Sequence, residues 1–75
     1  MDKETARRVN ELMLEASSHF DESVAFVRAN CSETEFVAYR DSISKIMADL
    51  WFNVLKPMYV EHPDLEPDEV KQGLL

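Results

Sequence analysis

The chain has 75 residues, of which 45% are apolar, and a formal net charge of −7. This length predicts a single domain, residues 1–75, near the lower size limit for folding alone. With one cysteine, Cys31, an intramolecular disulfide is excluded, and no Cys/His cluster has the spacing of a structural zinc site. The chain has one glycine and few turn residues before Pro57, so the composition excludes an all-β fold and predicts an all-α protein.

Fifteen acidic residues against eight basic ones argue against nucleic-acid binding, which depends on basic side chains that contact phosphates. The most apolar run, residues 50–60, is too short to span a bilayer. The charged first residues do not resemble a signal peptide, and a lone free cysteine fits a reducing compartment. We therefore expect a cytoplasmic protein with neither nucleic acid nor membrane as a partner.

The first predicted element is a helix over about residues 3–30. At about 100° per residue, its apolar side chains fall in one arc of about 120°, which is typical of a helix with one face on the core. The arc holds Ala6, Val9, Leu12, Met13, Ala16, Phe20, Ser23, Val24 and Val27. No residue in the stretch breaks a helix.

A turn at residues 30–32 separates the first helix from a second. Ser32 and Glu35 have the spacing of a capping box, and Asn30 is a suitable last residue for the first helix. Because so few residues join the two helices, they are predicted to lie antiparallel as a helical hairpin.

The second helix is predicted over about residues 33–61, with a kink at Pro57, which lacks an amide hydrogen. We expect the helix to continue past the proline because Met58 falls back on the apolar arc. That arc covers about 180° and holds Phe36, Val37, Tyr39, Ile43, Ile46, Met47, Leu50, Trp51, Val54 and Leu55. Residues 62–75 form a short tail, in which residues 67–69 suit a helical turn.

A single neighbouring helix cannot cover an apolar arc of this width, so a partner surface is expected. Two hairpins packed about a two-fold axis would form a four-helix bundle. The predicted core and dimer interface comprises Val9, Leu12, Met13, Phe20, Val27, Phe36, Tyr39, Ile43, Ile46, Met47, Leu50, Trp51 and Val54. The alternative is a monomer in which the chain after Pro57 folds back as a third layer.

The predicted function is that of a small non-enzymatic protein–protein interaction module, or a regulatory adaptor, that acts as a homodimer without a cofactor. Phe52 lies on the polar side of the second helix, and Tyr59 would join it there if a regular helix passed Pro57. With Lys56 and His62 they form a candidate docking site for another protein, which could be basic because the tail is acidic.

Two other functions are compatible with the sequence. His19 shares a helix face with Glu15 and Glu22 and could bind a metal, although the chain lacks the Glu-x-x-His pairs of di-iron bundles. The acidic tail could instead block a basic nucleic-acid-binding protein. Arg40 lies inside the apolar arc, where its stem would pack, or its head would pair with Glu33 or with an acid of a partner chain.

Overall fold

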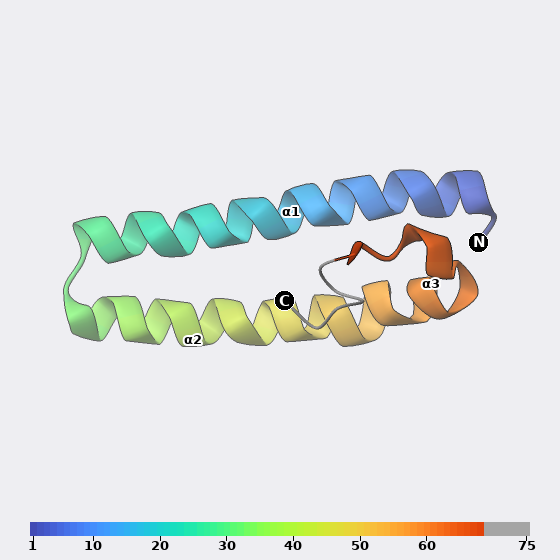
Figure 1. Cartoon of the computed structure of the whole chain (residues 1–75). Helices are drawn as coiled ribbons and strands as arrows, with labels where there is room; N and C mark the ends of the chain where they lie inside the picture. Colours follow the sequence, from blue (N-terminus) through green and yellow to red (C-terminus); the bar gives the residue numbers. More distant parts are fainter. Residues whose placement is uncertain (69–75) are drawn as a thin grey trace.

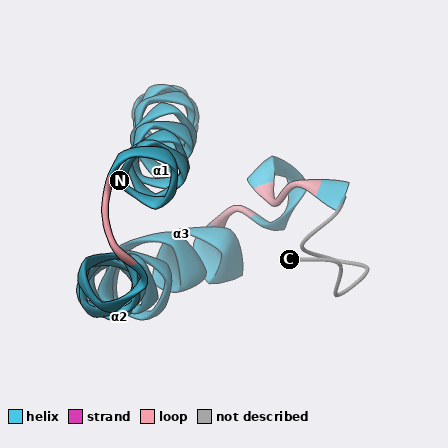
Figure 2. Ribbon diagram, turned by 90° about the vertical axis from the view of Figure 1, so that its left-hand side faces the viewer, coloured by secondary structure: helices cyan, strands magenta, loops and turns pink. Residues whose placement is uncertain are grey.

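The computed structural model describes residues 1–68, all of whose regular elements are helical. The elements are α1 (Lys3–Asn30), α2 (Glu33–Leu50), a π-helical turn (Trp51–Leu55), α3 (Lys56–Glu61) and a 3₁₀ turn (Pro63–Leu65). Figure 1 shows α1 and α2 side by side and antiparallel, and Figure 2 shows α3 turning away from the axis of α2 toward one side. The predicted all-α hairpin, with helices over 3–30 and 33–61, is confirmed. Of the predicted turn at 67–69, residue 69 lies outside the described residues.

Side chains cap the first turn of each long helix. The Asp2 carboxylate accepts a hydrogen bond from the Thr5 amide at 2.7 Å, which makes Asp2 the N-cap of α1. The Ser32 hydroxyl accepts one from the Glu35 amide at 3.2 Å, as the capping box predicts. These caps explain why the helices begin where the sequence indicated.

The second helix passes Pro57 through the π-helical turn instead of a simple kink. In this turn the Lys56 amide donates to the Trp51 carbonyl, five residues back. The wider turn lies directly before Pro57, where a regular helix would crowd the proline ring against a carbonyl of the preceding turn. Its extra residue sets every later residue back by about 100° around the helix axis.

This rotation brings Leu55, Met58 and Tyr59 to face α1. Together with Ala6 they form one buried cluster, in which each side chain is at most 7% exposed. Five partly buried hydrophobic residues pack around the cluster: Val9, Met13, Leu50, Trp51 and Leu65. The main core therefore lies at the end of the hairpin where α3 meets the start of α1.

The chain after α3 folds back on one side of the hairpin. Seen along the helices in Figure 2, this segment lies beside the α1–α2 pair, and the opposite side of the pair carries no described chain. The Asn10 side-chain amide donates to the Leu65 carbonyl at 3.3 Å, and Lys3 forms an ion pair with Asp64. The hairpin thus has a covered side and an open side.

The predicted interface residues divide into three classes of exposure. Phe36 and Ile43 are buried, whereas Leu12, Ile46 and Val54 are 40%, 47% and 41% exposed. The others are half-buried: Val9, Met13, Phe20, Val27, Tyr39, Met47, Leu50 and Trp51. Among residues 1–68, no helix combines the length and the apolar character needed to cross a membrane.

Candidate protein-binding surfaces

The open side of the hairpin carries a shallow apolar depression, which we call the open face. It measures about 470 Å³ and is lined by Met13, Ala16, Phe20, Ile46, Asp49, Leu50, Asn53 and Val54. Leu12 lies one helical turn before Ala16 and extends the same face. Asp49 is the only charged residue of the lining, so this side presents aliphatic and aromatic surface to solvent.

The covered side holds a second groove of about 350 Å³, which we call the covered groove. Its lining consists of Leu14, Ser17, Asp21, Met47, Leu50, Trp51, Leu55 and Tyr59. The Trp51 and Tyr59 rings pack with their centroids 5.9 Å apart and their planes tilted by 52°. Leu14 is 38% exposed, so this groove also keeps apolar surface in contact with solvent.

The predicted exposure of Tyr59 beside Phe52 is wrong. Tyr59 is 5% exposed, and its hydroxyl donates to Asn10 Oδ1 at 2.5 Å. The expectation assumed a regular helix, and the π-helical turn moves Tyr59 from the outer side to the core. Burial raises the pKa of the Tyr59 hydroxyl, and the nearby charge of Glu66 raises it further.

Phe52 and Lys56 lie on the outer surface of the second helix, as predicted. Phe52 is 59% exposed, and the Lys56 ammonium lies 5.6 Å from the centroid of its ring. That distance is within the range of a cation–π contact. Val60, one turn further along, is 76% exposed. Phe52 and Lys56 are thus the two candidate docking residues whose side chains remain accessible to another protein.

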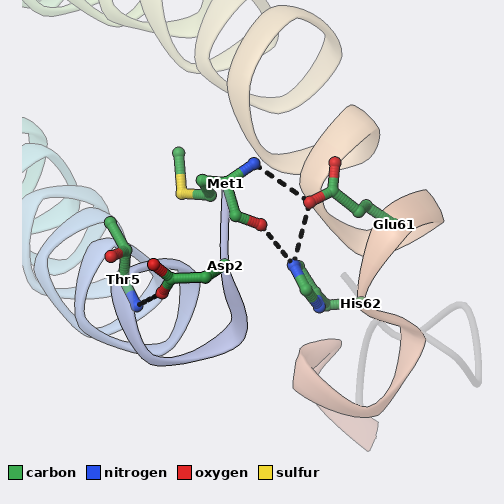
Figure 3. A network of polar contacts seen from close by, with 5 residues as sticks. All are labelled: Met1, Asp2, Thr5, Glu61 and His62. Carbon is green, nitrogen blue, oxygen red and sulfur yellow. Dashed lines mark hydrogen bonds and ion pairs between the residues drawn. The ribbon is translucent and has the colours of Figure 1, made fainter.

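His62 contacts the first residue of the chain, as Figure 3 shows. Its Nε2 atom lies 3.0 Å from both the Met1 carbonyl oxygen and Glu61 Oε1. The Met1 amino group donates to the same Glu61 oxygen at 3.0 Å. This hydrogen bond and the positive charge of the amino group lower the pKa of Glu61. With its side chain only 15% exposed, His62 joins two chain segments and offers little surface for docking.

The residues of the alternative metal-binding interpretation do not come together as a three-ligand site. His19 Nδ1 lies 3.2 Å from Glu22 Oε2, and both side chains are about three-quarters exposed. Within residues 1–68, no group of three or more His, Cys, Asp or Glu side chains is placed to hold a metal ion. Glu15 therefore does not complete a site with this pair.

A pair of arginines surrounds the buried Phe36 near the hairpin turn. The guanidinium carbon of Arg28 lies 5.2 Å from the Phe36 ring centroid, and that of Arg40 lies 5.4 Å from it. Phe36 itself is 6% exposed. Of the alternatives for Arg40, an ion pair with Glu33 is not formed within residues 1–68, where Arg40 pairs with Asp41 at 3.6 Å.

Arg28 is not among the residues predicted from the sequence, although a signal for it is present. In a tight hairpin, residues at similar distances before and after the turn lie opposite each other. Arg28 lies two residues before the end of α1 and Phe36 three residues after the start of α2, so their contact follows from the length of the turn.

Comparison of this chain with protein-family models, with curated proteins and with solved structures finds no match. The interpretation of its surfaces therefore depends on their geometry and chemistry alone.

Proposed function

We propose that this chain is a non-enzymatic protein-interaction module that acts as a homodimer through its open face. The observation that carries this proposal is the exposure of Leu12, Ile46 and Val54 along one side of the hairpin. Apolar surface contributes roughly 25 cal/mol per Å² when it is removed from water. A partner that covers this side would add stability that the hairpin alone does not have.

The small core of the single chain supports the same proposal. In the described part, six hydrophobic residues are buried, and no large side chain is fully enclosed. Small domains often compensate for such a core by oligomerisation when disulfides and metals are lacking. A second copy is the natural occupant because a two-fold axis brings identical apolar surfaces together.

In this dimer Phe52 and Lys56 would remain on the outside, available to another protein. Tyr59 and His62 are no longer part of that docking site because both are engaged inside the chain. The antagonist function, in contrast, requires a free acidic tail. Two of the acids concerned, Glu61 and Asp64, are already paired with Met1 and Lys3.

The decisive experiment is the molar mass by light scattering over a dilution series in reducing buffer. We expect twice the chain mass for the natural sequence and the chain mass for Ile46→Asp, whose carboxylate would be buried without a partner. Val60→Asp is the matched control, because Val60 is 76% exposed on α3, outside the open face. This variant should stay dimeric. A monomer at every concentration, or a dimer in both variants, would contradict the assignment of the open face.

A further inference from the structure

Arg28 and Arg40 present guanidinium groups that carboxylates of this chain leave largely unoccupied. Arg28 forms no ion pair or side-chain hydrogen bond within residues 1–68, and the 3.6 Å distance from Arg40 to Asp41 exceeds hydrogen-bond length. Arg7 and Arg8 differ, since they pair with Glu4 and Glu11 at 2.6 and 3.1 Å. In a chain of net charge −7, these two guanidinium groups lie near one ring, that of Phe36, and form a local cationic site with Asp41 beside Arg40.

The buried Phe36 ring holds the two arginines in position. A guanidinium stacked near an aromatic ring keeps its N–H edges free, and these edges can bind a carboxylate through two parallel hydrogen bonds. Because Phe36 is 6% exposed, the ring is fixed in the core and limits the positions that the arginine side chains adopt. Such preorganisation lowers the entropy cost of binding.

The covered groove lies on the same side of the hairpin as the two arginines. Asp21 and Met47 line this groove, and each is seven residues from the arginine on its own helix. Seven residues are two helical turns, so the groove begins about 10 Å from the cationic site. Asp21 would repel an acid placed inside the groove, and this sets the direction in which an acidic segment can bind.

We propose that this side of the hairpin binds an amphipathic acidic segment of another protein. Its carboxylates contact Arg28 and Arg40, and a bulky apolar side chain two helical turns away enters the covered groove beside Trp51. Charge complementarity selects this partner, because the cationic site adjoins an apolar groove in an otherwise acidic protein. The site lies on the side opposite the open face, so it does not depend on the proposed dimer.

The test uses the full chain and a synthetic helical peptide that lacks tryptophan and tyrosine. The peptide carries two glutamates at one end and two leucines two turns further along, and the matched peptide carries glutamines instead. Trp51, the one tryptophan of the chain, lines the groove and reports binding by its fluorescence. We expect saturable binding of the glutamate peptide and at least tenfold weaker binding of the glutamine peptide, since hydrogen bonds between charged groups are involved.

Variants of the chain show whether the arginines are responsible. Arg28→Gln and Arg40→Gln should each weaken the glutamate peptide roughly tenfold or more. Arg40→Lys should give an intermediate loss, because lysine keeps the charge without the planar fork. Arg8→Gln changes the net charge equally and should leave the affinity unchanged. Circular dichroism of each variant confirms that the helices are retained.

Three results would overturn the proposal. Equal affinity for the two peptides would mean that the groove binds apolar side chains without help from the arginines. No saturation up to millimolar peptide would show that the side is not a binding site of this kind. Displacement of the peptide by micromolar inorganic phosphate, at constant ionic strength, would identify the arginines as a phosphate site instead.

Discussion

At one end of the hairpin Ala6 of α1 meets Leu55, Met58 and Tyr59 in a common cluster, and the returning chain adds Leu65 to its edge. Near the turn, by contrast, the buried residues are Phe36 and Ile43, which lie outside that cluster. The two ends use the same pair of helices, so the difference comes from what covers them. Two helices alone bury a narrow strip, and a third segment is needed to enclose side chains from several directions.

Near the turn, the stems of long polar side chains take the place of that third segment. Arg28 and Arg40 lie over Phe36 and shield its ring while their charged groups stay in contact with water. The arginine side chains that cover Phe36 keep guanidinium N–H groups available as hydrogen-bond donors, whereas the apolar side chains that cover the other end offer no donors. The better-enclosed end therefore holds the main core, whereas the end near the turn keeps exposed arginine side chains, which carry the proposed recognition of an acidic partner.

The largest expected effect comes from changing the helical register between the two ends. In a Pro57→Ala background, deletion of Ser44 should turn every later residue by about 100° and move the Tyr59 cluster away from α1, abolishing cooperative unfolding. Deletion of Asn53 in the same background should remove the extra residue of the π-helical turn. Tyr59 then stays in the core, and the free energy of unfolding in urea should change by less than about 1 kcal/mol.

Equal losses for the two deletions would show that the π-helical turn does not set the register. The Pro57→Ala parent is the reference for both variants, because it removes the steric reason for a wide turn. Circular dichroism at 222 nm and the urea midpoint give the comparison directly.

The next largest effect is expected from truncating a buried aromatic residue of the second helix, compared with an exposed one. Tyr59→Ala should lower the free energy of unfolding by about 3–5 kcal/mol, as for other large core aromatics, because the side chain is 5% exposed. Phe52→Ala, at a position 59% exposed, should change it by no more than about 0.5 kcal/mol. Urea unfolding measures both, and a comparable loss for Phe52→Ala would contradict the placement of these side chains.

These aromatics also show how far the sequence could predict the fold. Helix boundaries at about residues 3, 30, 33 and 61 were predicted from local signals, which are the apolar periodicity, Asn30, the capping box at Ser32 and the prolines after residue 61. The π-helical turn was not predicted from them, because the choice between a kink and a wide turn at Pro57 depends on how Leu55, Met58 and Tyr59 pack on α1. An error of one residue in that turn placed Tyr59 on the wrong side of the helix.

The residues of the candidate sites were also predictable only where their placement depends on local sequence and not on packing between helices. Exposure of Phe52 followed from the periodicity before the turn, and the prediction held. The contacts of His62 with Met1 join residues 61 positions apart, which no local pattern indicates. To predict the pair of arginines, one would need to know that Arg28 and Arg40, from different helices, both lie near the Phe36 ring.

A smaller effect is expected from raising the pH. Because burial raises the pKa of Tyr59 in the folded chain, its contribution is fully present below its unfolded pKa of about 10 and is lost as the pH rises through the folded value. The free energy of unfolding should therefore fall above about pH 10. Tyr59→Phe should flatten this fall and, by leaving Asn10 Oδ1 without its donor, cost about 1–2 kcal/mol at neutral pH.

Tyr39→Phe is the matched control for that experiment. The Tyr39 hydroxyl donates to Ser23 at 2.9 Å, but its side chain is only half-buried near the middle of the hairpin. Urea unfolding at pH 7 and pH 11 should show that the alkaline loss survives in Tyr39→Phe. If Tyr59→Phe lost as much stability at pH 11, ionisation of Tyr59 would not be the cause of the alkaline loss.

The smallest effect concerns the acids that join the returning chain to α1. Hydrogen bonds from the Met1 amino group and from Lys3 are the main causes that lower the pKa values of Glu61 and Asp64. Carboxylates with lowered values stabilise the fold above their unfolded pKa and lose that contribution as the pH falls through the folded value. Stability should thus decrease below about pH 4, and less steeply in the double variant Glu61→Gln and Asp64→Asn.

Both pairs are exposed to solvent, so 1 M salt should mask most of this difference. Glu15→Gln is the control, because Glu15 is exposed, lies outside the open face and the covered groove and forms no ion pair within residues 1–68. Amide hydrogen exchange at pH 3 and pH 6 would locate the change. Faster exchange in α3 than in the first turns of α2 at pH 3 would show that acid opens the better-enclosed end first. Equal acceleration at both ends would mean that these carboxylates do not distinguish them.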